Sequence, residues 1–598
     1  MSHLTPSQLW HRARYTARRA LWTQIGSRLD DRYRSRAASL GGARFDHPGL
    51  ARVAALRCAR TRADASLAIA RDALAGRFCL LNETRELGVD VDWQRADLDV
   101  GTRLWKTQLH EFAWAIELAR AARDRADATF RERFEALLAS WAASARIGAP
   151  GSARDVWNAR AVANRIIHWS IAASILRLEP SDPLHARLRE QLGAHALFLR
   201  DNLELDLRGN HLLRDCVGLL FADAVLGAAP EALERLRAQV GAQLLADGCH
   251  VERAPLYHAW VLQDLVECRE LLGDAAPGWL REAVSRMAAF LDGLLPPSRA
   301  LPLFGDSWRG DIDPDLLLEQ AGAARARASR CDPAQGSGLV ALCRGEAHAV
   351  FRAGPHGPDQ QLGHAHADGL SFELYCGSAQ WITDSGTRTY DAGALRDRLR
   401  STAAHNTVQL DGEEQLEAWG SFRVGRRGRG RVVAWGAADA WEWIWAVHDG
   451  YRWLAGRPLH ERLLAVSPNA LIALDAVTGG GRHAIRSALH LHPDLPRERV
   501  AIAALRGEIQ QIEVALHERF NESRPMAEWF VECEAALPWF GGWGIAWELG
   551  GAPLAFELRE TATGCRLEWE GPAARSVSWN LKARSVEFGA ARAAHSAT

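Results

Sequence analysis

The sequence lacks any long apolar run. No stretch of about 18 consecutive apolar residues occurs among its 598 residues, which argues against a membrane-spanning helix. Residues 1–36 are basic and interrupted by charge every few positions, and they contain no apolar core of a secretory signal. We therefore expect a soluble protein located in the cytoplasm, with a periplasmic location left open.

Paired cysteines and net charge are also missing. The ten cysteines are scattered without a CxxC pair, which favours free thiols over a disulfide framework. The formal net charge is −1, so the chain as a whole has no electrostatic preference for nucleic acid or an anionic membrane. We expect neither as a partner, and an anionic ligand would need a local basic site.

The N-terminal half has the periodicity of helices. In residues 104–124, Leu109, Phe112 and Ile116 recur at three- and four-residue spacing. Residues 230–248 begin with Pro and end with Gly, which predicts a helix over that range. Many helices in series, with no strands between them and no fixed repeat length, predict an all-helical toroid or solenoid.

The period changes to two from about residue 338. Segments such as "GLVALCRGEAHAVFRAG" and "LSFELYCGSAQWITDSG" alternate apolar and polar positions between Gly, Asp and Asn turns. This pattern predicts an antiparallel β-sandwich of two sheets. The Gly- and Pro-containing residues 330–338 mark the boundary, so we expect a multidomain α+β chain. Its helical domain would span residues 1–335 and its β-sandwich residues 336–598, with a ligand cleft between them.

Two segments of the helical half carry groups that suit an anionic ligand. In "RGNHLLRD", Asn210 and His211 can donate hydrogen bonds, and Arg214 adds a planar fork that fits a carboxylate. The alternative is that the Asn-His pair is a helix cap or a satisfied core group.

The second segment is "DGCHVERAPLYHAW". It gathers Glu252, Arg253, Tyr257 and His258 around Pro255, after which a helix should restart. A Tyr after a Pro more often only packs, so the segment alone does not establish a function.

The β half contains a candidate metal shell. His366, Asp384 and His405 are spaced so that neighbouring strands could bring them together, and water could complete a zinc tetrahedron. His364 lies two residues before His366 and would share its face if the chain is extended there. A polar strand edge explains such an HxH pair equally well, and "LHLHPD" repeats the pattern, so spacing alone does not decide.

Taken together, these segments resemble the heparinase II/III-like polysaccharide lyases, a superfamily that includes alginate lyase families. The resemblance covers nearly the whole chain and rests on the order of these motifs: "WKTQLHEFAW" (105–114), "VWNARAVANRIIHW" (156–169), "GNHLLRD", "DGCHVERAPLYH", "GHAHADGLSFEL", "WITDSGTRTYD", "HNTVQLDG", "HDGY" (448–451) and "LHLHPD". It implies an incomplete (α/α) toroid followed by an antiparallel β-sandwich.

The resemblance also implies roles for individual residues. Tyr257, His364, Asn210 and His211 would be catalytic, with the Asn-His pair neutralising a uronate carboxylate. Arg214, Glu252 and His258 would contact substrate. His366, Asp384 and His405 would hold a structural zinc ion.

The reaction implied is β-elimination at a 4-O-linked uronate, which leaves an unsaturated uronyl end. The partner would be an anionic uronate-containing poly- or oligosaccharide of glycosaminoglycan, alginate or exopolysaccharide type. Whether the chain forms a homodimer stays open.

Three alternatives remain at this point. A glycoside hydrolase on a similar toroid could use Asp247, Glu252 and Asp306 as its carboxylates. A non-catalytic polysaccharide-binding or assembly protein would bind polymer without forming product. A zinc hydrolase is the least favoured, because it needs an open coordination position facing the cleft.

Overall fold

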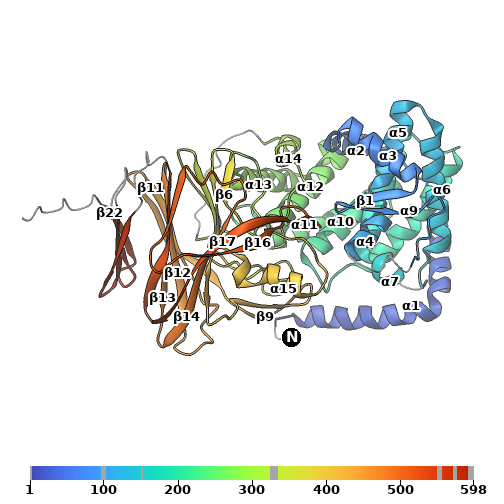
Figure 1. The fold of residues 1–598 in the computed structure, drawn as a ribbon. Helices are drawn as coiled ribbons and strands as arrows, with labels where there is room; N and C mark the ends of the chain where they lie inside the picture. Colours follow the sequence, from blue (N-terminus) through green and yellow to red (C-terminus); the bar gives the residue numbers. More distant parts are fainter. Residues whose placement is uncertain are drawn as a thin grey trace, which may run out of the picture.

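The computed structural model divides the chain into a helical half and a sheet-rich half (Figure 1). It describes residues 3–95, 103–149, 152–323, 334–547, 555–569 and 576–589. The helices of the first half are α1 (Pro6–Ala38), α2 (Pro48–Arg60), α3 (Ala63–Leu74), α4 (Arg103–Glu111), α5 (Trp114–Arg125), α6 (Ala128–Ser144), α7 (Ser152–Asp155), α8 (Ala159–Ile175), α9 (Pro183–Asp201), α10 (Gly209–Leu226), α11 (Ala232–Gln243), α12 (Pro255–Leu272), η2 (Gly273–Ala275), α13 (Gly278–Leu294) and α14 (Pro314–Ala321). This order confirms the predicted fold class.

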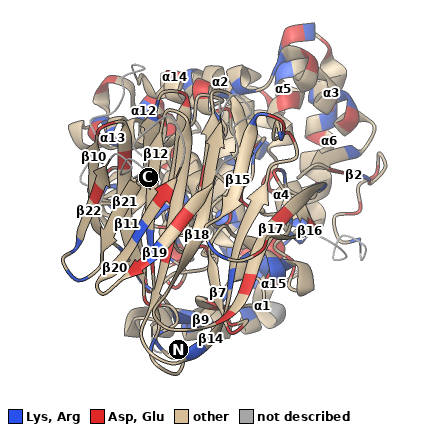
Figure 2. Cartoon of the chain, turned by 60° about the vertical axis from the view of Figure 1, so that its left-hand side comes forward, with Lys and Arg blue, Asp and Glu red and all other residues tan. Residues whose placement is uncertain are grey.

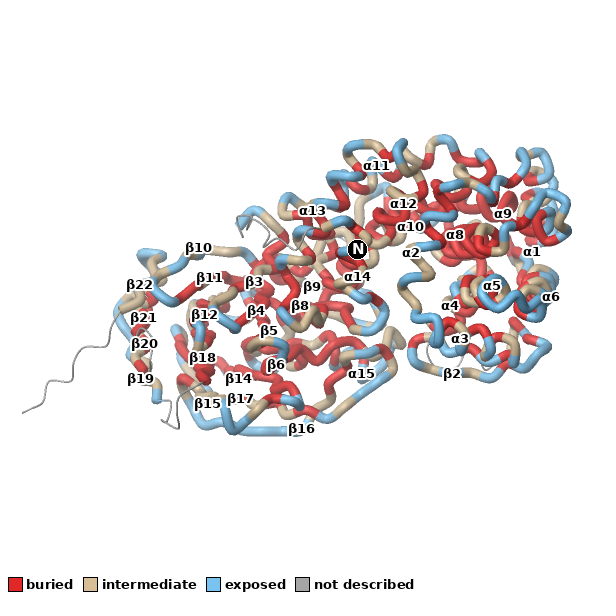
Figure 3. The backbone as a smooth tube through the Cα atoms, turned by 90° about the horizontal axis from the view of Figure 1, so that it is seen from above, coloured by how far each residue is buried: buried red, intermediate tan, exposed pale blue. Residues whose placement is uncertain are grey.

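The inner helices of the toroid are α8, α10 and α12. Most of their residues are buried, so these helices are covered on every side rather than along one stripe. Gly218 of α10 lets α8 approach closely, since a Cβ at this position would lie 2.7 Å from the Cβ of Ala163. The outer helices, including α1 and α9, cover this inner layer (Figure 3).

Two local expectations for the helical half were wrong. A hairpin of β1 (Arg77–Leu80) and β2 (Glu83–Glu86) interrupts the helices. The helix expected to reach Gly248 ends at Gln243, because Leu244 pairs with His250 and closes a turn. Gly248 lies in that turn with φ of +89°, a conformation that favours glycine, so it shapes the turn rather than capping the helix.

The β half contains two large antiparallel sheets. The eight-stranded sheet consists of β3 (Leu339–Arg344), β4 (Ala347–Arg352), β5 (Phe372–Cys376), β6 (Ala379–Ile382), β7 (Val408–Leu410), β14 (Arg482–Leu491), β16 (Gln510–Leu516) and β17 (Arg524–Ala536). The six-stranded sheet consists of β10 (Gly430–Ala438), β11 (Trp441–His448), β12 (Leu459–Ser467), β13 (Ala470–Thr478), β15 (Val500–Ala504) and β18 (Trp539–Trp547). A hairpin of β8 (Leu416–Trp419) and β9 (Arg423–Arg427) and the short helices α15 (Ala394–Arg400) and η3 (Thr402–Ala404) lie between these strands in sequence.

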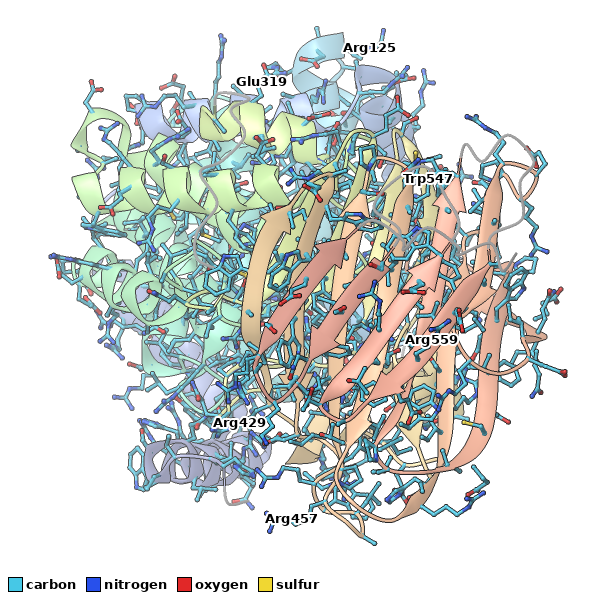
Figure 4. All side chains as sticks on the ribbon, turned by 90° about the vertical axis from the view of Figure 1, so that its left-hand side faces the viewer. Arg125, Glu319, Arg429, Arg457, Trp547 and Arg559 are labelled. Atoms are coloured by element: carbon cyan, nitrogen blue, oxygen red, sulfur yellow. The ribbon has the colours of Figure 1, made fainter. Side chains whose placement is uncertain are left out.

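A third sheet makes the β half three-layered rather than the two-layered sandwich that we expected. It consists of β19 (Phe556–Thr561), β20 (Gly564–Trp569), β21 (Ser576–Asn580) and β22 (Ser585–Gly589), and Figure 4 labels Arg559 on it. The middle sheet is apolar on both faces: Ile444 packs toward the eight-stranded sheet, while Trp445 packs edge-on against Trp579 at 5.5 Å. A sheet with two apolar faces has to be covered on both sides, which the third sheet does.

The expected domain boundary at residue 335 directly follows residues 324–333, which are outside the described residues. The last described helix of the first half ends at Ala321, and the eight-stranded sheet begins at Leu339. The boundary itself stays a prediction.

The two halves meet through loops of the β half that reach the N-terminal ends of α10 and α12. The amide of Asp306 donates to the carbonyl of His364 at 3.0 Å, and the side chain of Gln361 lies beside Gly209. Figure 2 shows basic and acidic residues interspersed along the helices and strands. Within the described residues, no helix is both long and apolar enough to span a membrane.

Candidate active site

A tyrosine and a histidine from different halves of the chain form the centre of the site. Tyr257 lies in the first turn of α12, where Pro255 occupies the first helical turn as expected. His364 lies in the loop between β4 and β5. The two rings stack with centroids 3.9 Å apart, and the Tyr257 hydroxyl lies 2.7 Å from that of Tyr390. Burial and the nearby carboxylate of Asp306 raise the pKa of Tyr257 well above its usual value, so its hydroxyl is protonated at neutral pH.

Asp306 fixes the orientation of His364. Its Oδ2 lies 2.9 Å from Nδ1 of His364, and the Arg396 guanidinium binds both oxygens of the carboxylate. Burial alone would raise the pKa of Asp306. Arg396, His364 and His366 nevertheless hold this pKa well below its usual range. Because Asp306 is ionised, its Oδ2 accepts a hydrogen bond from Nδ1–H of His364, which leaves Nε2 of that ring as the candidate base.

Asn210 is held at the N-terminus of α10 by Glu252. The backbone amide of Asn210 donates to Oε1 of Glu252 at 2.8 Å, and its side-chain amide donates to both oxygens. Arg160 donates to Oδ1 of Asn210 at 3.1 Å. Position 209 favours glycine, because its φ is +55° and a Cβ there would lie 2.1 Å from Oε1 of Glu252. Glu252 is therefore a carboxylate that holds the helix terminus and orients Asn210.

His211 is the most open of the predicted catalytic residues. Its side chain is 27% exposed, and its Nδ1 lies 3.0 Å from Oε2 of Glu204. Burial would raise the pKa of Glu204, but His211 and Arg160 outweigh it and lower the value. With Nδ1 donating to that carboxylate, Nε2 of His211 remains for a ligand.

Two predicted substrate contacts are engaged inside the protein. Arg214 donates to Asn164 at 2.6 Å and forms an ion pair with Asp264. His258 accepts from the amide of His250 through Nδ1, and its Nε2 lies 3.0 Å from the carbonyl of Met287. Since both ring nitrogens of His258 have backbone partners, the structure does not present this ring to a substrate.

The predicted zinc ligands, His366, Asp384 and His405, are fully buried, and His366 follows His364 by two residues. The rings of His366 and His405 have centroids 5.4 Å apart, and Asp384 Oδ2 lies 2.7 Å from Nδ1 of His405. Among the described residues, no group of three or more His, Cys, Asp or Glu is arranged to hold a metal ion. Nδ1 of His366 and Nε2 of His405 are nevertheless buried without hydrogen-bond partners. Such bare imidazole nitrogens are the donors that zinc prefers, so the donor chemistry fits.

The three carboxylates of the hydrolase alternative are unsuited to it. An inverting or retaining hydrolase needs one carboxylic acid with a raised pKa. The pKa values of Glu252 and Asp306 are both lowered, by their histidine neighbours and, for Asp306, chiefly by Arg396, against the effect of burial. Asp247 accepts hydrogen bonds from the amides of Cys249 and Ser337.

A surface cavity of about 560 Å³ lies away from this site, against α13 and α14. Its polar lining includes Asp292, Asp313, Asp315 and Glu319, with Arg299 already paired to Asp292 and Asp315. Carboxylates repel an anionic sugar, so this cavity does not compete with the Tyr257–His364 site for such a ligand.

Three residues of the site were not predicted: Arg160, Tyr390 and Arg396. Arg160 and Tyr390 fall in the quoted segments 156–169 and "WITDSGTRTYD", so motif order alone pointed near them. Arg396 comes from α15 and has no sequence signal, since its partner Asp306 is 90 residues away.

A helical toroid joined to a β-sandwich, with a Tyr-His pair where the halves meet, is the architecture expected of the polysaccharide lyase superfamily that the sequence resembles. Family profiles matched to the sequence agree with this resemblance. A profile of the heparinase II/III N-terminus matches residues 22–319, and a heparinase II/III-like C-terminal profile matches residues 326–540. The chain belongs to the heparinase II/III-like family.

Of two proteins with similar sequences, one is named for its localisation and the other for an enzymatic activity. The chain is 27% identical over 453 residues to the FtsZ-localized protein C of Caulobacter vibrioides, covering 70% of this chain and 75% of that protein. It is 22% identical over 369 residues to the heparin-sulfate lyase of Pedobacter heparinus, covering 55% of each.

Solved structures share the fold. The crystal structure of heparinase III matches with a TM-score of 0.66 at 14% identity, covering 95% of this chain and 97% of that one. A heparan sulfate lyase mutant from Pedobacter heparinus matches with a TM-score of 0.60 at 16% identity, covering 95% and 94%. At these identities the likeness concerns the fold alone.

Proposed function

We propose that the protein is a polysaccharide lyase that cleaves a uronate-containing polysaccharide by β-elimination. A base removes the C5 proton of the uronate, the electron pair forms the C4–C5 double bond, and the C4–O4 bond breaks. The departing O4 takes a proton from an acid. The products are a new hydroxyl end and an unsaturated uronyl end.

The observation that carries this proposal is the stacked Tyr257–His364 pair, in which Asp306 is hydrogen-bonded to His364. His364 has its Nδ1 on an ionised carboxylate, which supports Nε2 as the base for the C5 proton. Tyr257 keeps its proton because its pKa is raised, which supports it as the acid that protonates O4. The pair thus supplies one group for each proton transfer.

The charge that develops on the uronate carboxylate needs cationic or hydrogen-bonding neighbours. Arg160 and His211 flank Asn210 and are more exposed than it is. We assign the carboxylate to this group, with Glu252 keeping Asn210 in place. Stabilisation of developing charge by such preorganised donors is usually the largest single contribution to catalysis.

We also propose a structural zinc ion held by His366 and His405, with Asp384 as third ligand or as the partner that orients His405. His366 Nε2 lies 3.0 Å from Asp306 Oδ1, so its Nδ1 carries the lone pair. When bound, the ion would fix the strands and loop that carry His364. No chemical step passes through it.

A second candidate function follows from one comparison. The Caulobacter relative is named for its localisation with FtsZ rather than for an activity. A protein on this scaffold that binds polysaccharide without cleaving it would retain affinity and form no product.

Ultraviolet absorbance of the conjugated double bond separates these functions. We would test heparan sulfate, hyaluronan, chondroitin sulfate, alginate and a uronate-containing exopolysaccharide. Tyr257→Phe should abolish any rise, whereas Tyr33→Phe, which removes the hydrogen bond of a buried tyrosine to Asp201 in the outer helices, should not. Reducing ends without absorbance would indicate hydrolysis, and binding without either product would indicate the non-catalytic function.

A further inference from the structure

The β8–β9 hairpin has one face fixed to the loop that carries His364. Ala418 and Val424 are paired across the hairpin, so their side chains share a face. That face packs against Leu362, Ala365 and Ala367, which flank His364 and His366 in sequence. The hairpin is therefore packed directly onto the loop that carries His364. Figure 1 shows its second strand, β9, near α15.

The opposite face of the hairpin is open to solvent. Trp419 pairs with Arg423, so the two side chains share this face, and Trp419 is 44% exposed. Within the described residues, the Arg423 guanidinium has no ion pair or hydrogen bond, and the residue is exposed. An exposed indole and an unpaired guanidinium thus lie side by side on the open face of the hairpin.

Phe422, at the tip of the hairpin, connects this face to the catalytic residues. Its ring lies edge-on to His364 at 5.7 Å and to Tyr390 at 5.0 Å, yet the residue is 44% exposed. Phe422 therefore contacts the proposed base and faces solvent at the same time.

Two arginines of α15 hold the tip in place through hydrogen bonds to its backbone carbonyls. Arg396 donates to the carbonyl of Ser421 at 3.0 Å and at the same time binds Asp306. Arg400 donates to the carbonyls of Gly420 and Arg423 at 3.3 Å and 3.4 Å. Arg396 thus joins the hairpin tip to the carboxylate that orients His364, so the tip is preorganised relative to the catalytic pair.

We infer that the tip of the β8–β9 hairpin is a sugar-binding subsite beside the catalytic pair, which takes a pyranose of the anionic chain adjacent to the cleaved uronate. Phe422 and Trp419 offer flat apolar surfaces to the C–H faces of sugar rings, and Arg423 pairs with a carboxylate or sulfate. This inference rests on the substrate class of the proposed function. The charge of Arg423 and the continuity with His364 favour an anionic sugar over an apolar partner.

The test measures binding separately from cleavage. The polysaccharides named above would be titrated by calorimetry against the full chain carrying Tyr257→Phe, which holds polymer without turning it over. Trp419→Ala, Phe422→Ala and Arg423→Gln would each be added to this background. Each should raise the Kd at least about tenfold, equivalent to about 1.4 kcal/mol, and Arg423→Gln should also reduce its salt dependence.

Matched controls are available elsewhere on the β half. Trp435, on β10, is also 44% exposed, and Arg499 is an exposed arginine outside the site. Trp435→Ala and Arg499→Gln should leave the Kd unchanged. Because Phe422 touches His364, the decisive variants are those of Trp419 and Arg423, which are not among the proposed acid-base or carboxylate-binding groups.

The outcomes separate this inference from the proposed function. If wild-type protein cleaves a polymer but the Trp419 and Arg423 variants bind it as tightly as their parent, the subsite is wrong and the lyase stands. If polymer is bound more weakly by these variants but never cleaved, the subsite stands and the lyase falls. If no polymer binds, both are wrong.

Discussion

Tyr257 and His364 stack face to face at a centroid distance of 3.9 Å although α12 supplies one ring and the β half the other. The proposed acid and base therefore meet only when the two halves are docked. Contacts that fix the docking, such as the pairing of Asp306 with both His364 and Arg396, are therefore part of the proposed site, although neither contact is with a ligand.

Asp306→Asn should slow catalysis with little change in substrate affinity. The amide keeps the size of the side chain but cannot accept from His364 and Arg396 as the carboxylate does. We expect kcat to fall by up to about 10⁴-fold, the scale for replacing by its amide a carboxylate that orients a general-base histidine, while KM changes little.

Asp475→Asn is the matched control for this variant. Asp475 is likewise buried and accepts from Arg462 and His460, but it lies on β13. Steady-state kinetics and thermal melting of both variants are the measurement. An equal loss of activity in the two variants would mean that Asp306 acts only through stability.

The profile of kcat/KM against pH should stay level from neutral pH into the alkaline range. An acid contributes while it is protonated. Burial raises the pKa of Tyr257, so the fall in enzyme activity that follows its deprotonation moves to higher pH. If Tyr257 were instead the base, activity would keep climbing about tenfold per pH unit up to the alkaline limit, which the same measurement would reveal.

Much of the fold could be read from the sequence because it is encoded locally. The change of period near residue 338 separated the halves, and Pro255 marked the start of α12. The early end of α11 could not be read, because it depends on the Leu244–His250 bridge that closes the following turn. The third sheet was missed because both faces of β11 are apolar, as shown by Ile444 and Trp445, and an alternating pattern assigns only one.

The site was predicted in part. Tyr257, His364, Asn210 and His211 were predicted from motif order, and the structure places them around the same interface; their roles stay predictions. Asp306 was considered only as a hydrolase carboxylate, since its hydrogen bond to His364 spans 58 residues. His258 and Arg214 were expected to face substrate, but their partners Met287 and Asp264 are set by helix packing, which sequence spacing does not reveal.

Purified protein should contain about one zinc ion per chain, and His405→Ala should lose it. A proton on Nε2 of His405 would be buried without an acceptor, so a metal ion satisfies this nitrogen better. Elemental analysis and the fall of the melting temperature on chelation are the measurements. His460→Ala, which alters a buried histidine bound to Asp475, should keep its metal. Absence of zinc from wild-type protein purified without chelator, with no melting shift on added zinc, would contradict the proposal.

Glu267→Gln should destabilise the helical half at neutral pH but not in acid. Glu267 on α12 is buried and pairs with Arg57 and Arg60 of α2. Burial alone would raise its pKa, but the arginines outweigh burial and hold the pKa at about 2. A carboxylate with a lowered folded-state pKa stabilises the fold above its unfolded value and loses this contribution as pH falls toward 2.

At pH 7 the cost of Glu267→Gln should be about 3–5 kcal/mol, the usual effect of removing one partner of a buried ion pair. The difference from wild type should shrink below about pH 4, where the unfolded glutamate begins to hold its proton. Far-ultraviolet circular dichroism during denaturation follows the helical half, with Glu190→Gln as the control because its pair with Arg34 is half exposed. A cost that stays constant from pH 7 to pH 3 would show that the side chain stabilises α12 by packing rather than by charge.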